Sequence, residues 1–139
     1  MSGSNTTRTQ LAEALLKHHA GDRFEVFSAG LEAGTIHPHT RSVLQELGVQ
    51  MQGQTPKYLR DYLGITFNHL ITLTDEGEDA PIFPGVSTRL DWNVAKPQQH
   101  ASIEDQLNAF RVVRNQLDLM VHNFVMDYDL FKLGVKVEQ

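Results

Sequence analysis

Short apolar runs alternate with amphipathic segments along this chain, and this alternation restricts the fold more than any other feature of the sequence. Apolar residues at helical spacing predict helices, and β-branched or aromatic runs between them predict strands. Strands separated by helices form parallel sheets with the helices packed on their faces. We therefore predict an α/β fold, a three-layer sandwich in which helices flank a short parallel sheet. The predicted helices cover residues 9–19, 38–48, 57–63 and 102–126, and the predicted strands cover 23–29, 69–74 and 90–94.

Composition limits the functions that such a domain can have. The chain has 139 residues, which suits a single domain, and 17 acidic against 12 basic residues give a formal charge of -5. This balance offers no general affinity for nucleic acid or for an anionic membrane. Since no apolar run approaches the length of about 18 residues needed to span a bilayer, we expect a cytoplasmic protein. The chain has no cysteine, which excludes disulfides, thiolate metal sites and any mechanism through a protein thiol.

The polar N-terminal stretch leads directly into the first predicted helix. Backbone N–H groups and hydroxyls there lie at the positive end of a helix dipole, an arrangement that binds tetrahedral oxyanions. Glycine and asparagine tolerate the backbone angles of an anion cradle, and arginine offers a planar fork to two anion oxygens. The alternative is a polar arm that only caps the helix. The candidate oxyanion-binding residues are Ser2, Gly3, Ser4, Asn5, Thr6, Thr7, Arg8 and Thr9.

These residues also resemble a known family. The run from Ser2 to Glu13 is similar to the phosphate loop of low-molecular-weight protein tyrosine phosphatases and of the related thioredoxin-coupled arsenate reductases. The similarity extends in order to about residue 118. It implies the phosphatase-like α/β fold and an oxyanion bound at the N-terminal loop. Further landmarks are Ser28-Ala29-Gly30, Leu70-Ile71-Thr72-Leu73, Pro81-Ile82-Phe83-Pro84-Gly85, Leu90-Asp91-Trp92 and the run from Asn108 to Arg114.

The sequence departs from this family at the positions that carry its chemistry. The nucleophilic cysteine of the family falls on Ser2, and the general-acid aspartate falls on Lys96. A serine hydroxyl without a neighbouring base is a poor nucleophile, and a lysine donates no proton readily near neutral pH. The two further cysteines of the reductases fall at or near Thr74 and Ala80, which cannot be oxidised in their place. The resemblance therefore implies a catalytically inactive protein that binds phosphate, arsenate or a phospho-ligand, with Lys96 added to its oxyanion site.

The resemblance also implies a missing first strand. In the family an apolar strand precedes the phosphate loop and lies in the middle of the sheet, whereas here Met1 adjoins the loop directly. Residues 131–137 alternate with period two, and we expect them either to replace this strand or to form a loose C-terminus. We accordingly divide the chain into a domain over residues 1–126 and a tail over residues 127–139, the tail being a candidate strand or dimerisation element.

Several alternatives stay open at this point. The histidine pairs of His37-Pro38-His39 and of His18-His19 lack a convincing third ligand, so we expect no metal and no cofactor. The sequence is also compatible with an active phosphatase or reductase whose N-terminus was truncated or whose catalytic cysteine was changed to serine. A third possibility is a dimerisation or adaptor module whose old active site is vestigial. Apolar residues that continue past Leu117 favour a possible homodimer.

Overall fold

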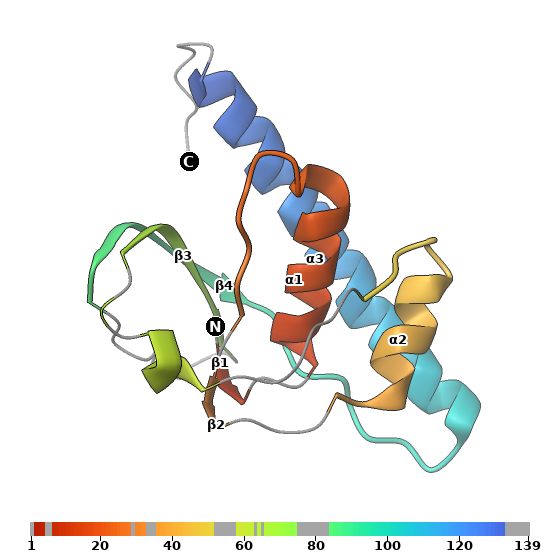
Figure 1. The fold of residues 1–139 in the computed structure, drawn as a ribbon. Coiled ribbons are helices and arrows are strands. Elements are labelled where there is room, and N and C mark those ends of the chain that lie inside the picture. Colours follow the sequence, from red (N-terminus) through yellow and green to blue (C-terminus); the bar gives the residue numbers. More distant parts are fainter. Residues whose placement is uncertain are drawn as a thin grey trace.

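The computed structural model describes residues 2–4, 7–28, 30–32, 36–51, 58–62, 64, 66–74 and 84–132. Within these residues the predicted α/β architecture is confirmed, because short parallel strands lie beside a group of packed helices (Figure 1). The strands are β1 (Ser2–Ser4), β2 (Gly30–Glu32), β3 (Phe67–Thr74) and β4 (Val86–Asn93). The helices are α1 (Arg8–Ala20), α2 (Pro38–Gln45), the 3-10 helix η1 (Leu59–Tyr62) and α3 (Ile103–Lys132).

The strands form two parallel pairs. β1 pairs with β2 from Ser2 opposite Gly30 to Ser4 opposite Glu32. β3 pairs with β4 along its whole length, and β1 also lies beside β3. The three-residue β1 therefore stands between β2 and β3, where the resemblance places the longer central strand.

The three α-helices pack against one another, and α1 and α2 both contact the long helix α3 (Figure 1). α1 forms because its apolar residues recur at helical spacing, and Leu11 and Leu15 are fully buried on the side that faces the core. Residues of α2 and α3 complete this core together with the end of β3. Its buried members include Val43, Leu44, Leu73, Val94, Phe110, Val113, Leu117 and Val121.

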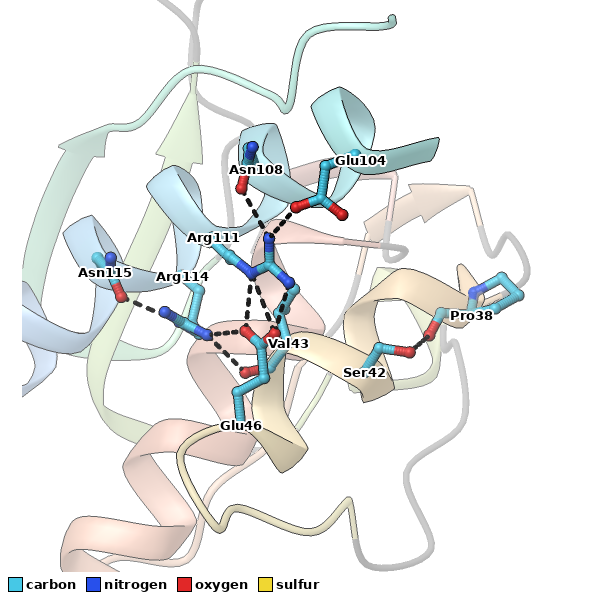
Figure 2. A network of polar contacts seen from close by, with 9 residues as sticks. All are labelled: Pro38, Ser42, Val43, Glu46, Glu104, Asn108, Arg111, Arg114 and Asn115. Atoms are coloured by element: carbon cyan, nitrogen blue, oxygen red, sulfur yellow. Dashed lines mark hydrogen bonds and ion pairs between the residues drawn. The ribbon is translucent and has the colours of Figure 1, made fainter. Parts of the chain in front are cut away.

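A polar network joins the end of α2 to α3 (Figure 2). Glu46 lies between two arginines of α3: its Oε1 accepts from Arg114 at 2.6 Å, and its Oε2 accepts from Arg111 at 2.7 Å. Arg114 also donates to the carbonyl of Val43 at 2.9 Å, so a cation covers the negative end of α2. The hydrogen bond from Arg111 lowers the pKa of the Glu46 carboxyl, and the bond from Arg114 lowers it further against the opposing effect of burial.

The strand predicted over residues 23–29 is wrong, since residues 24–28 adopt no strand. Their aromatic side chains pack as the pattern requires: Phe24 lies 4.5 Å from Tyr128 between ring centroids, and Phe27 lies 5.8 Å from Phe67. A strand also needs a neighbour that shares backbone hydrogen bonds. The described pairing with β1 begins at Gly30, after this segment.

Other differences concern boundaries and faces. His18 has the helical spacing of Leu11 and Leu15 but is exposed, and Leu47 keeps 41% of its surface in solvent. The strand predicted over 90–94 begins earlier, at Val86, and η1 is a single 3-10 turn inside the helix predicted over 57–63.

The last helix does not end near residue 126 but continues to Lys132. The strand predicted over residues 131–137 is therefore wrong for its first two positions. Residues 133–137 lie outside the described part of the chain, and the division into a domain and a tail stays a prediction.

Candidate functional site

The start of α1 lies at the carboxyl edge of the β3–β4 pair. Arg8 donates from Nη1 to the carbonyl oxygen of Val94 at 2.7 Å, and Val94 directly follows β4. The Val94 N–H in turn donates to the carbonyl of Thr74, the last residue of β3, at 3.2 Å. Ligands of open α/β sheets bind at this edge, beyond the carboxyl ends of the strands.

Arg8 places a permanent positive charge inside the protein at this point. Its side chain is buried, with 4% of the residue exposed, and it stands in the first turn of α1. Its charge adds to the positive end of the helix dipole, so this position favours an anion.

The N-terminus of α1 is capped differently from those of the other two α-helices. In α2 the ring Nδ1 of His37 accepts from the His39 N–H at 3.0 Å, and before α3 the hydroxyl of Ser102 accepts from the Asp105 N–H at 3.1 Å. At α1 the side chain of the N-cap residue Thr7 makes no capping hydrogen bond. This terminus is therefore not closed by its own N-cap side chain.

Thr9, in the first turn of α1, has a buried hydroxyl without a partner. The residue is 1% exposed, and within the described part of the chain its Oγ1 has no hydrogen-bond partner. An unsatisfied buried hydroxyl costs about 1–3 kcal/mol. An oxygen-rich ligand at the helix terminus would remove this cost. The hydroxyl of Thr40 in α2 is buried in the same way, which provides a matched position away from α1.

Lys96 reaches the same region through the chain. It is exposed and lies in the segment after β4, two residues beyond Val94. Two residues span at most about 7 Å, so the backbone of Lys96 lies within that distance of Val94, whose carbonyl Arg8 contacts. A place for Lys96 in the oxyanion site stays a prediction.

The remaining predicted site residues are only partly described. Ser2, Gly3 and Ser4 form β1, where a loop was expected, and their side chains lie outside the description. Asn5 and Thr6 also lie outside the described residues.

Two further positions bear on the comparison with the reductases. Thr74 is buried at the end of β3, where its hydroxyl donates to Asn93 Oδ1 at 3.1 Å. Ala80 lies outside the described residues.

Two contacts of the site leave no mark in the sequence. Arg8 contacts the backbone carbonyl of Val94, and every residue has such a carbonyl. The sequence therefore marks Val94 only as the last residue of the strand predicted over 90–94. Gln10, which is fully buried, donates to the hydroxyl of Ser28 at 3.4 Å and ties α1 to the segment before β2.

The histidine pairs have structural roles. The rings of His37 and His39 lie 4.8 and 5.4 Å from that of Phe110 between centroids, so they pack against α3. Burial lowers the pKa of His37, and the neighbouring His39 lowers it further. His19 contacts Asp118 of α3 at 2.8 Å.

Among the residues that the structure describes, no three histidine, aspartate or glutamate side chains are grouped so as to hold a metal ion. None of the helices in this part of the chain has both the length and the apolar character that a bilayer crossing needs.

Comparisons with known proteins agree on one family. Residues 1–130 match the family model of low molecular weight phosphotyrosine protein phosphatase. An arsenate reductase of Shouchella clausii (strain KSM-K16) is 28% identical over 122 residues, which cover 86% of this chain and 88% of that protein. A solved arsenate reductase in the phosphate binding state has a TM-score of 0.76 at 26% identity, covering 91% of this chain and 93% of the other. The Corynebacterium glutamicum thioredoxin-dependent arsenate reductase has a TM-score of 0.70 at 30% identity, covering 91% of this chain and 58% of the other. The chain belongs to the low molecular weight phosphotyrosine protein phosphatase family.

Proposed function

We propose that this protein binds a small tetrahedral oxyanion, phosphate or arsenate or the phosphate group of a larger ligand, at the N-terminus of α1, and that it does so without catalysis. The observation that carries the proposal is the buried hydroxyl of Thr9, which has no hydrogen-bond partner among the described residues, in the position that follows the buried cation of Arg8. One anion oxygen would satisfy the hydroxyl, and a guanidinium is a strong hydrogen-bond donor to an oxyanion. The solved relative in a phosphate binding state supports the choice of ligand.

The absence of catalysis follows from the chemistry of two residues. A thiolate at position 2 would be stabilised by a helix terminus, but an alkoxide of Ser2 starts far too basic for that stabilisation to suffice. Lys96 stands where the family has its general acid, and a lysine does not readily protonate a leaving group near neutral pH. Since the chain has no cysteine, reduction of arsenate through its own thiols is also excluded.

We expect Lys96 to change which anions the site prefers without preventing anion binding. An ammonium in place of a carboxylic acid adds positive charge near the start of α1. At an effective dielectric of about 20, this charge contributes roughly 1–2 kcal/mol to the binding of a dianion. We therefore expect dianions to bind more tightly than monoanions of the same shape.

The test is thermal denaturation of the full chain with and without phosphate. Phosphate at about 100 times its dissociation constant stabilises a protein by about 2.7 kcal/mol. Thr9→Val keeps the shape of the side chain and removes the hydroxyl, so the phosphate-dependent rise in Tm should shrink. Thr40→Val is the control and should leave that rise unchanged.

The same variants separate binding from folding. Without phosphate, Thr9→Val should be as stable as the natural chain or slightly more stable, because an unpaired buried hydroxyl has been removed. Failure of phosphate or arsenate to raise the Tm of the natural chain would remove the binding proposal. An equal rise in the natural chain and in Thr9→Val would show that Thr9 takes no part.

A further inference from the structure

The carbonyl of Val94 that accepts from Arg8 lies just beyond the end of the β3–β4 ladder. The register of the two strands ends with Thr74 opposite Asn93, and Val94 is the next residue. The Val94 N–H donates to the Thr74 carbonyl at 3.2 Å. Strand ends open more readily than strand centres, because fewer contacts hold them. The orientation of the Val94 carbonyl therefore depends on what fixes the chain at this point.

Thr74 fixes this point through its side chain as well. Its hydroxyl donates to Oδ1 of Asn93 at 3.1 Å, and the residue is 3% exposed. A valine would suit a buried strand equally, since both side chains are β-branched, so the strand itself does not require this hydroxyl. Thr74 contacts two consecutive residues, the side chain of Asn93 and the N–H of Val94. It therefore holds the end of β4 at both of them.

We propose that Thr74 and Asn93 are positioning residues that fix the Arg8 guanidinium for the anion at the start of α1. The inference rests on the proposed function. The Thr74 hydroxyl holds Asn93, and the Thr74 carbonyl holds the N–H of Val94. The Val94 carbonyl in turn accepts from Arg8 Nη1 at 2.7 Å. Neither positioning residue needs to touch the anion, because both act through Val94.

Fixing the guanidinium before the anion arrives increases the affinity of the site. An arginine side chain has many rotamers, and confining it on binding lowers the affinity for a ligand. Arg8 is 4% exposed and is bonded to the Val94 carbonyl, so its rotamer is set when the protein folds. Loosening the end of β4 leaves part of this confinement to the binding step. We expect the phosphate affinity to fall by about threefold to tenfold, the usual effect of confining one such side chain.

Thr72 provides a matched control two residues earlier on the same strand. It is also 3% exposed, and its hydroxyl donates to Asp91, the residue opposite it in β4. Because side chains alternate along a strand, Thr72 and Thr74 project from the same face of β3. Thr72→Val therefore removes the same kind of bond from the same pair of strands, but not at the end that carries Val94.

Hydrogen exchange of the Arg8 side-chain N–H groups tests the positioning without any phosphate. Nuclear magnetic resonance of the labelled full chain should show faster exchange in Thr74→Val than in the natural chain. Asn93→Ala removes the acceptor at an exposed position and should have the same effect. Thr74→Ser keeps the hydroxyl, so it should exchange like the natural chain, and so should Thr72→Val. Exchange that is unchanged in both Thr74→Val and Asn93→Ala would overturn the proposal.

Calorimetric titration of the same variants with inorganic phosphate tests the consequence for binding. Thr74→Val and Asn93→Ala should raise Kd by about threefold to tenfold, whereas Thr74→Ser and Thr72→Val should leave it unchanged. An equal loss of affinity in Thr74→Val and Thr72→Val would overturn the proposal, because it would reflect a general loosening of the two strands. If the natural chain binds no phosphate, the proposed function fails, but faster Arg8 exchange in Thr74→Val would still show that Thr74 positions Arg8.

Discussion

Replacing Glu46 by glutamine tests how the α2–α3 junction is held together. Glu46 accepts hydrogen bonds from both Arg114 and Arg111, and Arg114 is the more buried of the two, with 9% of its side chain exposed (Figure 2). Removing the partner of a buried charge costs about 3–5 kcal/mol. The cost is smaller here because 39% of the Glu46 side chain is exposed to water, and Arg114 keeps its bonds to Val43 and Asn115.

We therefore expect Glu46→Gln to lower the free energy of unfolding by about 1.5 kcal/mol, the value of one hydrogen bond to a charged group. For a chain of this length that corresponds to a fall in Tm of roughly 5 °C. Urea denaturation followed by circular dichroism measures the free energy directly. Glu104→Gln is the matched control, because Glu104 contacts Arg111 at 3.4 Å with 74% of its side chain exposed, and it should change the stability little.

The pH dependence gives a second check on the same variant. The pKa of Glu46 is lowered in the folded protein, so its contribution is complete above the usual glutamate pKa of about 4.3. The contribution is lost as the pH falls through the lower pKa of the folded state. The stability difference between the natural chain and Glu46→Gln should therefore shrink in acid. Equal effects of Glu46→Gln and Glu104→Gln, or a difference that grows below pH 4, would refute this account.

Three further predictions concern the histidines and the oxyanion site. The natural chain should lose stability as the pH falls below about 6.5, because the pKa of His37 is lowered in the folded protein and a protonated Nδ1 cannot accept the hydrogen bond from the His39 N–H. His37→Asn keeps a capping side chain that does not titrate. In thermal denaturation this variant should lose less stability between pH 7.5 and pH 5 than the natural chain. Lys96→Gln should weaken phosphate binding by about tenfold in calorimetry at low salt, whereas Lys17→Gln, a change at a lysine that pairs with Glu13, should leave the affinity unchanged. Neither the natural chain nor Ser2→Cys should hydrolyse phenyl phosphate above the buffer rate, because the basic phenolate needs a general acid and we assign Lys96 to the position of that acid; turnover by either would contradict this assignment.

Local patterns in the sequence predict the helices well. Apolar spacing together with the stop at Gly21 places α1 within one residue of its observed bounds at each end. Ser102 predicts the start of α3 because a cap is a contact between near neighbours. The end of α3 is missed because its last turns pack against distant residues, and the ring of Tyr128 lies 4.5 Å from that of Phe24 between centroids.

Strands and site contacts depend more on distant residues. Residues 23–29 have a strand-like pattern, yet no pattern within them shows whether a neighbouring strand exists. In the candidate site, the motif alone predicts Arg8 and Thr9. The Val94 carbonyl that accepts from Arg8 is 86 residues away. Since every residue has a backbone carbonyl, the sequence does not show which one Arg8 contacts.

Nuclear magnetic resonance of the labelled full chain during a phosphate titration tests the central claim most directly. We predict saturable shifts of the Thr9 amide and of the Arg8 side-chain N–H, with the same midpoint and with no comparable change at the Thr40 amide. Phosphate that leaves the Thr9 and Arg8 signals unmoved, or that shifts only resonances elsewhere in the protein, would contradict an oxyanion site at the start of α1.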